Sequence, residues 1–238
     1  MIRIVVYGCC GRMGGRIIDL AQRSPGCRVV AGLERPGHPA CGTQVQGVSV
    51  TDDAAVLANA DVAVDFTAPA ATLALLPKAQ QYRIALVIGT TGMEKDQVAK
   101  IEVASQMVPV VYSPNMSVAV NVLFGLVQDA AAKLAGYQVR IREAHHIHKK
   151  DAPSGTAKRL AQIIEDQTRQ LVNDIDAVRE GEIIGDHEVI FESDVDTLTL
   201  RHSAKTRDIF VKGAIAAALW VVGKPAGMYG MQDVLGRR

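Results

Sequence analysis

The sequence predicts an α/β protein with a Rossmann-like doubly wound parallel sheet and a second α+β domain that carries an open mixed sheet. Three observations favour this class. Over the first half of the chain, short β-branched apolar runs alternate with segments of helical period. Continuous runs such as IRIVVY and IALVI suit strands that are buried on both faces of a sheet. Beyond residue 115 two strand-like runs are consecutive, which favours antiparallel neighbours.

Each element follows from its own periodicity. In the first half we expect strands at 2–7, 28–33, 62–66, 84–88 and 108–112, and helices at 12–23, 69–81 and 94–106. In the second half we expect helices at 117–135, 154–171 and 206–222, and strands at 138–144, 187–193 and 195–202. Residues 1–115 with 207–238 are therefore predicted to form a dinucleotide-binding domain, and residues 116–206 a substrate-binding and oligomerisation domain.

Composition excludes several classes of protein. Of the 238 residues, 48% are hydrophobic and 21% are charged, which is unlike a disordered chain. The formal net charge of +1 gives no global attraction to nucleic acid or to an anionic membrane. No apolar run is long and unbroken enough for a signal peptide or a membrane span. We expect a cytoplasmic protein with neither nucleic acid nor a membrane as partner.

The cysteines give no metal signature. Cys9, Cys10, Cys27 and Cys41 contain no CxxC pair, and the adjacent pair is poorly spaced for one tetrahedral metal or for a disulfide. We interpret them as reduced small hydrophobic residues and predict no metal.

A glycine-rich turn lies between the first expected strand and the first expected helix. Gly8, Gly11 and Gly14 would let backbone N–H groups approach a pyrophosphate at a helix N-terminus. Glu34 ends the second expected strand, where a carboxylate can accept hydrogen bonds from ribose hydroxyls. Arg35 could pair with the 2′-phosphate of NADP, so NADH or NADPH is the expected cofactor. The alternatives are a plain tight turn and a solvated arginine.

The segment HHIHKKDAPSGTA is the most unusual in the chain. It places five basic residues within six positions, just before an expected helix start: His145, His146, His148, Lys149 and Lys150. Such a cluster, with the N–H groups of the helix start, can hold a small dicarboxylate. A histidine among lysines loses its proton more easily, which suits acid–base work, and a positioned lysine can donate a proton.

Two other interpretations of this segment stay open. It could be a solvated basic turn. It could also be a metal site, with His146 and His148 on one strand face and Asp151, His187 or His202 as a distant third ligand. The roles of Arg179, His187, His202 and Arg207 are not assigned by the sequence.

Six strings together resemble one family, that of 4-hydroxy-tetrahydrodipicolinate reductase, also called dihydrodipicolinate reductase. They are GCCGRMG, VDFT, GTTG, SPNMSVAVN, EAHHIHKKDAPSGTA and RHSAKTRDIFVKGA. The resemblance covers most of the chain. It implies NAD(P)H-dependent reduction of (4S)-4-hydroxy-2,3,4,5-tetrahydrodipicolinate to tetrahydrodipicolinate with loss of water, in lysine and diaminopimelate biosynthesis. It also implies a homotetramer.

The resemblance also implies roles for individual residues. His145 would donate or accept a proton, and Lys149 would donate one. His146, Gly155 and Thr156 would bind the substrate carboxylates. The residues implied to line the cofactor are Gly8, Cys9, Cys10, Gly11, Arg12, Met13, Glu34, Arg35, Thr67, Gly89, Thr90, Thr91, Ser113, Pro114, Asn115 and Met116. No residue is implied to bind a metal.

Three other functions compete with this one. The first is another two-domain NAD(P) oxidoreductase acting on a small amino or hydroxy acid. The second is a non-catalytic nucleotide sensor, which would bind NADPH without turnover. The third is a metal-dependent hydrolase that uses the histidines and would contain stoichiometric zinc.

Overall fold

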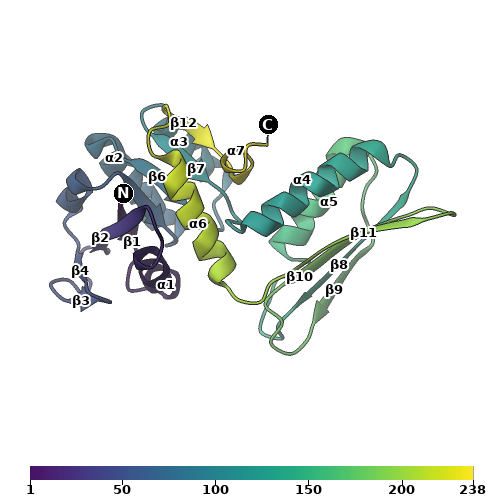
Figure 1. Cartoon of the computed structure of the whole chain (residues 1–238), viewed down its shortest axis with the longest axis horizontal. Helices are drawn as coiled ribbons and strands as arrows, with labels where there is room; N and C mark the ends of the chain where they lie inside the picture. Colours follow the sequence, from purple (N-terminus) through teal and green to yellow (C-terminus); the bar gives the residue numbers. More distant parts are fainter. Residues whose placement is uncertain (238) are drawn as a thin grey trace. The chain divides into compact units, whose positions relative to one another are not determined.

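The structure is a computed structural model that describes residues 1–237, and its chain divides into two compact units (Figure 1). The first unit comprises Met1–Ser117 and the C-terminal segment that starts at Phe210. The second unit comprises Val118–Ile209.

An eight-stranded sheet forms the centre of the first unit. Its strand order is β12-β7-β6-β5-β1-β2-β4-β3, and all neighbours are parallel except β3 and β4. The strands are β1 (Ile2–Tyr7), β2 (Cys27–Leu33), β3 (Gln44–Val45), β4 (Val48–Thr51), β5 (Val62–Asp65), β6 (Ala85–Ile88), β7 (Pro109–Tyr112) and β12 (Gly227–Tyr229). The order reverses at β1, between β5 and β2, so the carboxyl ends of β1 and β5 form the switch point where open α/β sheets bind ligands.

Helices complete the first unit. They are α1 (Arg12–Gln22), α2 (Pro69–Tyr82), α3 (Lys95–Ser105), α6 (Asp208–Val221, from Phe210 onward) and α7 (Met231–Val234), with a 3₁₀ turn at Ala54–Asn59. Pro69 starts α2 in the first helical position, where its missing N–H costs nothing. Glu94 caps α3 through a capping box with Gln97. No helix within residues 1–237 has the length and apolar character needed to cross a lipid bilayer.

The second unit is built on a four-stranded mixed sheet with the order β11-β10-β8-β9. The strands are β8 (Gln138–His145), β9 (Ile175–Arg179), β10 (Asp186–Glu192) and β11 (Thr197–Ser203). Only β8 and β9 run parallel. Helices α4 (Val118–Lys133) and α5 (Gly155–Thr168) pack against one face of the sheet, around a core that includes Ile141, Leu160 and Phe191. The predicted fold class, including the open mixed sheet, is confirmed.

Local differences from the predicted elements have physical causes. Strands β3 and β12 are two and three residues long, too short for an alternating pattern to be visible. Strand β9 is only partly buried along its length, so its sequence lacks a continuous apolar signal. Helix α5 ends at Thr168 rather than at residue 171, because Arg169 takes the left-handed conformation with φ +60 and caps it.

Candidate active site

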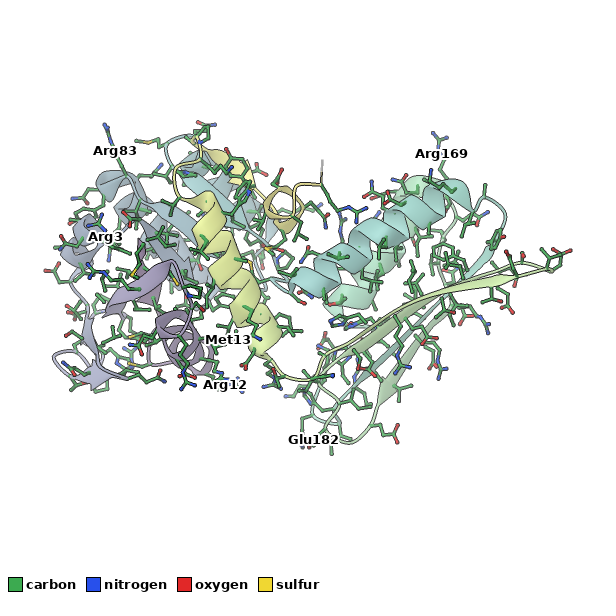
Figure 2. All side chains as sticks on the ribbon, in the orientation of Figure 1. Arg3, Arg12, Met13, Arg83, Arg169 and Glu182 are labelled. Atoms are coloured by element: carbon green, nitrogen blue, oxygen red, sulfur yellow. The ribbon has the colours of Figure 1, made fainter. Side chains whose placement is uncertain are left out.

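The glycine-rich turn connects β1 to α1 and depends on the absence of side chains. Gly8 has φ +74, and a Cβ there would lie 2.5 Å from Cγ2 of Thr67. A Cβ on Gly14 would lie 2.1 Å from the carbonyl oxygen of Gly8. Helix α1 therefore begins directly against the turn, at the point marked by Arg12 and Met13 in Figure 2.

The carboxylate of Glu34 lies beside this turn. Its Oε1 accepts a hydrogen bond from the backbone N–H of Cys10 at 2.9 Å. The N–H of Arg35 donates to Oε2 at 3.4 Å, and the Arg35 side chain is exposed. The sequence-predicted pair thus follows the carboxyl end of β2, with the Glu34 carboxylate against the turn and Arg35 exposed to solvent.

A buried carboxylate fixes the two neighbouring loops. Asp65 Oδ1 accepts from the N–H of Thr67 at 2.8 Å and from its hydroxyl at 2.6 Å. The hydroxyl of Thr72 lies 2.5 Å from Asp65 Oδ2 and 2.9 Å from the hydroxyl of Thr90. Burial raises the pKa of Asp65 above its usual value, against these hydrogen bonds. Asp65 therefore links Thr67 to the loop Gly89–Thr91, through the hydroxyl of Thr72.

The other predicted cofactor residues follow β7. The Ser113 hydroxyl donates to the carbonyl of Asn115 at 2.8 Å, and Pro114 is exposed. Met116 is buried, and its carbonyl approaches Gly213 so closely that a Cβ there would lie 1.7 Å away. The side chains of Cys9, Thr90, Ser113 and Met116 are all buried. Contacts of these four residues with a dinucleotide would therefore use mainly their backbone.

This set of residues fits a dinucleotide. The glycines at 8 and 14 let the turn pack closely against Thr67 and the start of α1, and Gly11 supplies no side-chain cap to α1 within the described chain. The positive end of the helix is thus available to an anion. The Glu34 carboxylate would supply an acceptor for ribose hydroxyls of a bound dinucleotide.

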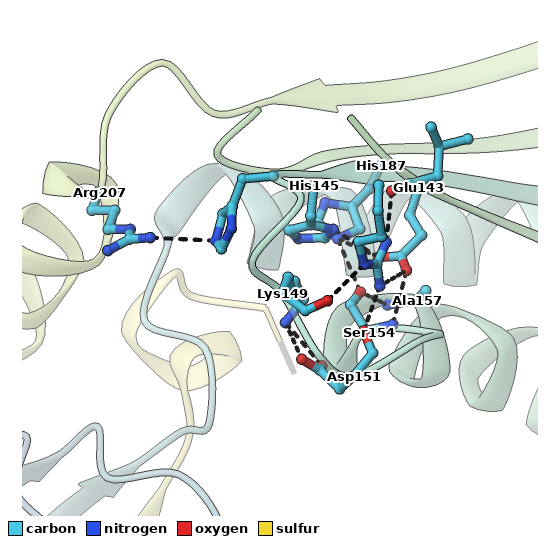
Figure 3. A network of polar contacts seen from close by, with 11 residues as sticks. Glu143, His145, Lys149, Asp151, Ser154, Ala157, His187 and Arg207 are labelled. Atoms are coloured by element: carbon cyan, nitrogen blue, oxygen red, sulfur yellow. Dashed lines mark hydrogen bonds and ion pairs between the residues drawn. The ribbon is translucent and has the colours of Figure 1, made fainter. Parts of the chain in front are cut away.

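A separate polar cluster lies in the second unit, at the carboxyl end of β8 (Figure 3). Glu143 and His145 are two residues apart and so share one face of the strand. His187 on β10 is the cross-strand partner of Glu143, and Arg179 on β9 is the partner of His145. Glu143, His145 and His187 are all buried.

Glu143 is the centre of this cluster. Its Oε1 accepts from Arg179 Nη2 at 2.9 Å and from the N–H of Ser154 at 3.0 Å. Its Oε2 lies 3.0 Å from His145 Nδ1 and 3.9 Å from His187 Nε2. Burial alone would raise the pKa of Glu143, but the hydrogen bonds from Ser154 and Arg179 outweigh it and hold the pKa below its usual value. Glu143 is therefore ionised at neutral pH.

The two histidines are neutral at pH 7. Burial lowers the pKa of His145, against the attraction of Glu143, and lowers the pKa of His187 to about 4. Their rings meet edge to face, with centroids 5.1 Å apart. Since His145 turns Nδ1 toward Glu143, Nε2 is left on the side of Gly185, where a Cβ would be only 3.0 Å away. His145 can thus exchange a proton through Nε2.

Arg179 ties the cationic loop to the sheet. Its Nε donates to the carbonyl of Lys149 at 3.3 Å, and its Nη2 donates to the carbonyl of Asp151. The Lys149 ammonium donates to both carboxylate oxygens of Asp151, at 2.6 and 2.8 Å. Lys149 must exchange this partner before it can give a proton to a ligand.

The residues predicted to bind carboxylates lie around the same loop. His146 Nε2 is 3.4 Å from Arg207 Nη2. Gly155 and Thr156 open α5, immediately after Ser154, whose hydroxyl accepts from the N–H of Ala157 at 3.2 Å. A helix start and a histidine–arginine pair are both suited to an anion.

Sequence reasoning missed part of this cluster. Glu143 could have been found, because its spacing of two from His145 places both on one strand face. The sequence predicts a helix that starts at Ser154, but it gives no sign that this residue contacts Glu143 and lies 3.3 Å from His187 Nε2. His187 and Arg179 were left open, since only the strand pairing brings them to Glu143.

Two groups of potential metal ligands occur in residues 1–237, each with ligand atoms within 4.8 Å of one another. They are Glu143, His145 and His187, and Cys9, Cys10 and Glu34. The pair His146 and His148, one of the sequence-based possibilities, has ring centroids 6.0 Å apart and belongs to neither group.

A dinucleotide-type turn on one unit and a buried acid–base cluster beside a cationic loop on the other define a two-domain, nicotinamide-dependent oxidoreductase. Residues 2–116 match the N-terminal part, and residues 119–235 the C-terminal part, of dihydrodipicolinate reductase. The chain belongs to the dihydrodipicolinate reductase family.

Relatives in sequence and structure agree with this assignment. The chain is 41% identical to the 4-hydroxy-tetrahydrodipicolinate reductase of Anaeromyxobacter dehalogenans strain 2CP-1, over 100% of this chain and 99% of that protein. It is 42% identical to that of Ralstonia pickettii, over 99% of this chain and 100% of that protein. The dipicolinate-bound dihydrodipicolinate reductase of Paenisporosarcina sp. TG-14 shares the fold, with a TM-score of 0.84, 23% identity and coverage of 98% and 99%.

Proposed function

We propose that this chain reduces (4S)-4-hydroxy-2,3,4,5-tetrahydrodipicolinate to tetrahydrodipicolinate, with loss of water and oxidation of NADH or NADPH, in lysine and diaminopimelate biosynthesis. The observation that carries the proposal is the buried Glu143–His145 pair beside the loop of Lys149, in a chain that belongs to the family along nearly its whole length.

Residues 1–115 and 207–238 are assigned to dinucleotide binding. The reduced nicotinamide supplies the hydride when it is bound. The N–H groups of the turn hold the pyrophosphate, Glu34 accepts from ribose hydroxyls, and Arg35 pairs with a 2′-phosphate when the cofactor is NADPH. The residues assigned to this site are Gly8, Cys9, Cys10, Gly11, Arg12, Met13, Glu34, Arg35, Thr67, Gly89, Thr90, Thr91, Ser113, Pro114, Asn115 and Met116.

Residues 116–206 are assigned to substrate binding. His146, Gly155 and Thr156 bind the two carboxylates of the substrate, which cationic and helix N-terminal groups favour. Reduction adds a proton as well as a hydride to the substrate. His145 Nε2 exchanges protons with the ring of the substrate. Lys149 is the second proton donor, after its ammonium leaves Asp151.

The second unit is also assigned to assembly. We expect a homotetramer formed through its sheet, and a cytoplasmic enzyme. Light scattering on the purified protein would test the tetramer directly.

The test of the reaction couples two enzymes. Substrate is generated from pyruvate and aspartate semialdehyde by the preceding synthase, and the absorbance of NADH or NADPH is followed. Rapid oxidation of NADH or NADPH that depends on the synthase supports the function. The relative rates with NADH and NADPH rank the two cofactors. Binding of either dinucleotide without oxidation would overturn the reaction and favour another dehydrogenase or a nucleotide sensor.

A further inference from the structure

The glycine-rich turn brings two adjacent sulfur atoms to one side of the chain. Cys9 Sγ and Cys10 Sγ lie 3.8 Å apart. A carboxylate oxygen of Glu34 lies within 4.8 Å of both sulfurs. In an extended segment neighbouring side chains point to opposite faces, so this juxtaposition is a product of the turn. The proposed reaction uses neither thiol.

We propose that Cys9, Cys10 and Glu34 form a binding site for one soft divalent cation, of the Zn²⁺ or Cd²⁺ type. In tetrahedral zinc sites each Zn–S bond is about 2.3 Å, which places two sulfur ligands about 3.8 Å apart. The two sulfurs already have this separation, contrary to the expectation from their adjacency in the sequence, whereas a disulfide would require them to approach to about 2.05 Å. Thiolates with a carboxylate are a donor set that such ions accept.

The surroundings hold all three ligands in place. Gly32 lacks a side chain where a Cβ would lie 2.5 Å from Cys9 Sγ, so the buried sulfur fits against β2. The N–H of Cys10 holds the Glu34 carboxylate at 2.9 Å, beside the second sulfur. Cys10 is exposed, which gives an ion its entry. On binding, each thiol releases its proton to solvent, and water can take the fourth position.

Occupation of this site has a consequence for the cofactor. Glu34 cannot bind a metal ion and accept hydrogen bonds from ribose with the same oxygens, and the ion would stand in the turn that faces the pyrophosphate. Metal and dinucleotide should therefore exclude each other. This consequence rests on the proposed function, but the metal site itself does not.

Metal binding is tested first, on the full chain with reduced thiols and no dinucleotide. Cd²⁺ is titrated while the ultraviolet thiolate-to-cadmium absorption is followed, and bound metal is counted after desalting. We expect one Cd²⁺ per chain and the thiolate band, with loss of both in Cys10→Ser. The matched control is Cys41→Ser, which changes a thiol outside the three ligands and should keep both. Absence of the band, its persistence in Cys10→Ser, or its loss in Cys41→Ser would each overturn the assignment.

Competition is tested by the fluorescence of bound NADH. With Cd²⁺ at about ten times its Kd, the apparent Kd of NADH should rise about tenfold, because the two ligands compete by mass action. In Cys10→Ser, NADH affinity should not respond to Cd²⁺. An unchanged NADH Kd at saturating Cd²⁺ would overturn the exclusion. Bound Cd²⁺ in a protein that binds no dinucleotide even without metal would instead refute the proposed function and leave the metal site intact.

Discussion

The Glu143 carboxylate lies 3.0 Å from Nδ1 of His145, and both side chains are buried. The negative charge of Glu143 favours a proton on Nδ1, although the two atoms lack hydrogen-bond geometry, and we predict that Nε2 is the nitrogen that accepts and returns a proton. Arg179 and Ser154 hold the other oxygen of Glu143 by hydrogen bonds. The carboxylate is thus held beside the histidine ring before any ligand arrives.

Replacement of His145 by Gln tests the proton transfer. His145→Gln is expected to lower kcat by about 10² to 10⁴, the range for loss of a general acid or base. Its affinity for NADH should stay unchanged, because the dinucleotide turn is in the other unit. The measurement is steady-state turnover together with NADH binding by fluorescence.

The matched control for this change is His148→Gln. His148 lies in the same loop but is exposed, and its Nε2 is 3.7 Å from a carboxylate oxygen of Glu182. It should retain wild-type turnover. A loss below tenfold in His145→Gln would remove His145 from the acid–base role.

We predict that Glu143 acts as a positioning residue for His145, and that removal of its charge changes the pH dependence of the reaction. Burial lowers the pKa of His145 and the Glu143 charge raises it, so Glu143→Gln should lower that pKa further. The acid limb of kcat/KM should move to lower pH, and kcat at neutral pH should fall by about 10- to 100-fold.

Glu143→Asp serves as the conservative variant for this test, since it keeps the charge. It should retain the wild-type position of the acid limb. If Glu143→Gln lowers stability but leaves the pH profile unmoved, Glu143 is structural only.

His187 should make the fold less stable in mild acid. Its pKa is about 4 because burial penalises the charged ring, whereas the unfolded chain has the ordinary value near 6.5. Between these values the unfolded state binds a proton that the folded state does not, so stability is full above pH 6.5 and falls as pH falls toward 4. From pH 7.5 to pH 5 the loss from this group is about 2 kcal/mol.

Urea unfolding at the two pH values measures this loss in the wild type and in His187→Gln. The neighbouring titratable and charged groups are His145, Glu143, His202 and Asp186. Their contributions remain in both proteins, so the difference between the two pH dependences reports His187. Equal pH dependence in the two proteins would refute the buried neutral histidine.

The sequence predicted the features of the fold that depend on residues close together in the chain. Continuous apolar runs identified β1, β5 and β6, and their order with helices implied the parallel sheet. Gly8 and Gly14 were found because a strand–turn–helix context is local, and the structure adds that a Cβ on either would collide with its surroundings.

The acid–base cluster could be predicted only in part, because it is assembled by strand pairing. His187 is 44 residues from Glu143 in the chain, and only the register of β10 against β8 places it opposite. Arg179 lies on β9, whose partial burial hides its pattern, and reaches Glu143 by the parallel pairing with β8. Pairing across such separations leaves no periodic signal in a single sequence.

We predict that cofactor selectivity depends on one exposed side chain, that of Arg35. A guanidinium–phosphate contact is charge-assisted, with a worth of about 1.5 to 3 kcal/mol, so Arg35→Ala should raise the Kd of NADPH about 10- to 100-fold. The Kd of NADH, which lacks the 2′-phosphate, should change little. Arg28→Ala is the control, since it removes an exposed arginine from the opposite end of β2 and should alter neither value. Equal weakening of NADH and NADPH in Arg35→Ala would show that Arg35 acts on the turn as a whole and makes no selective contact with the phosphate.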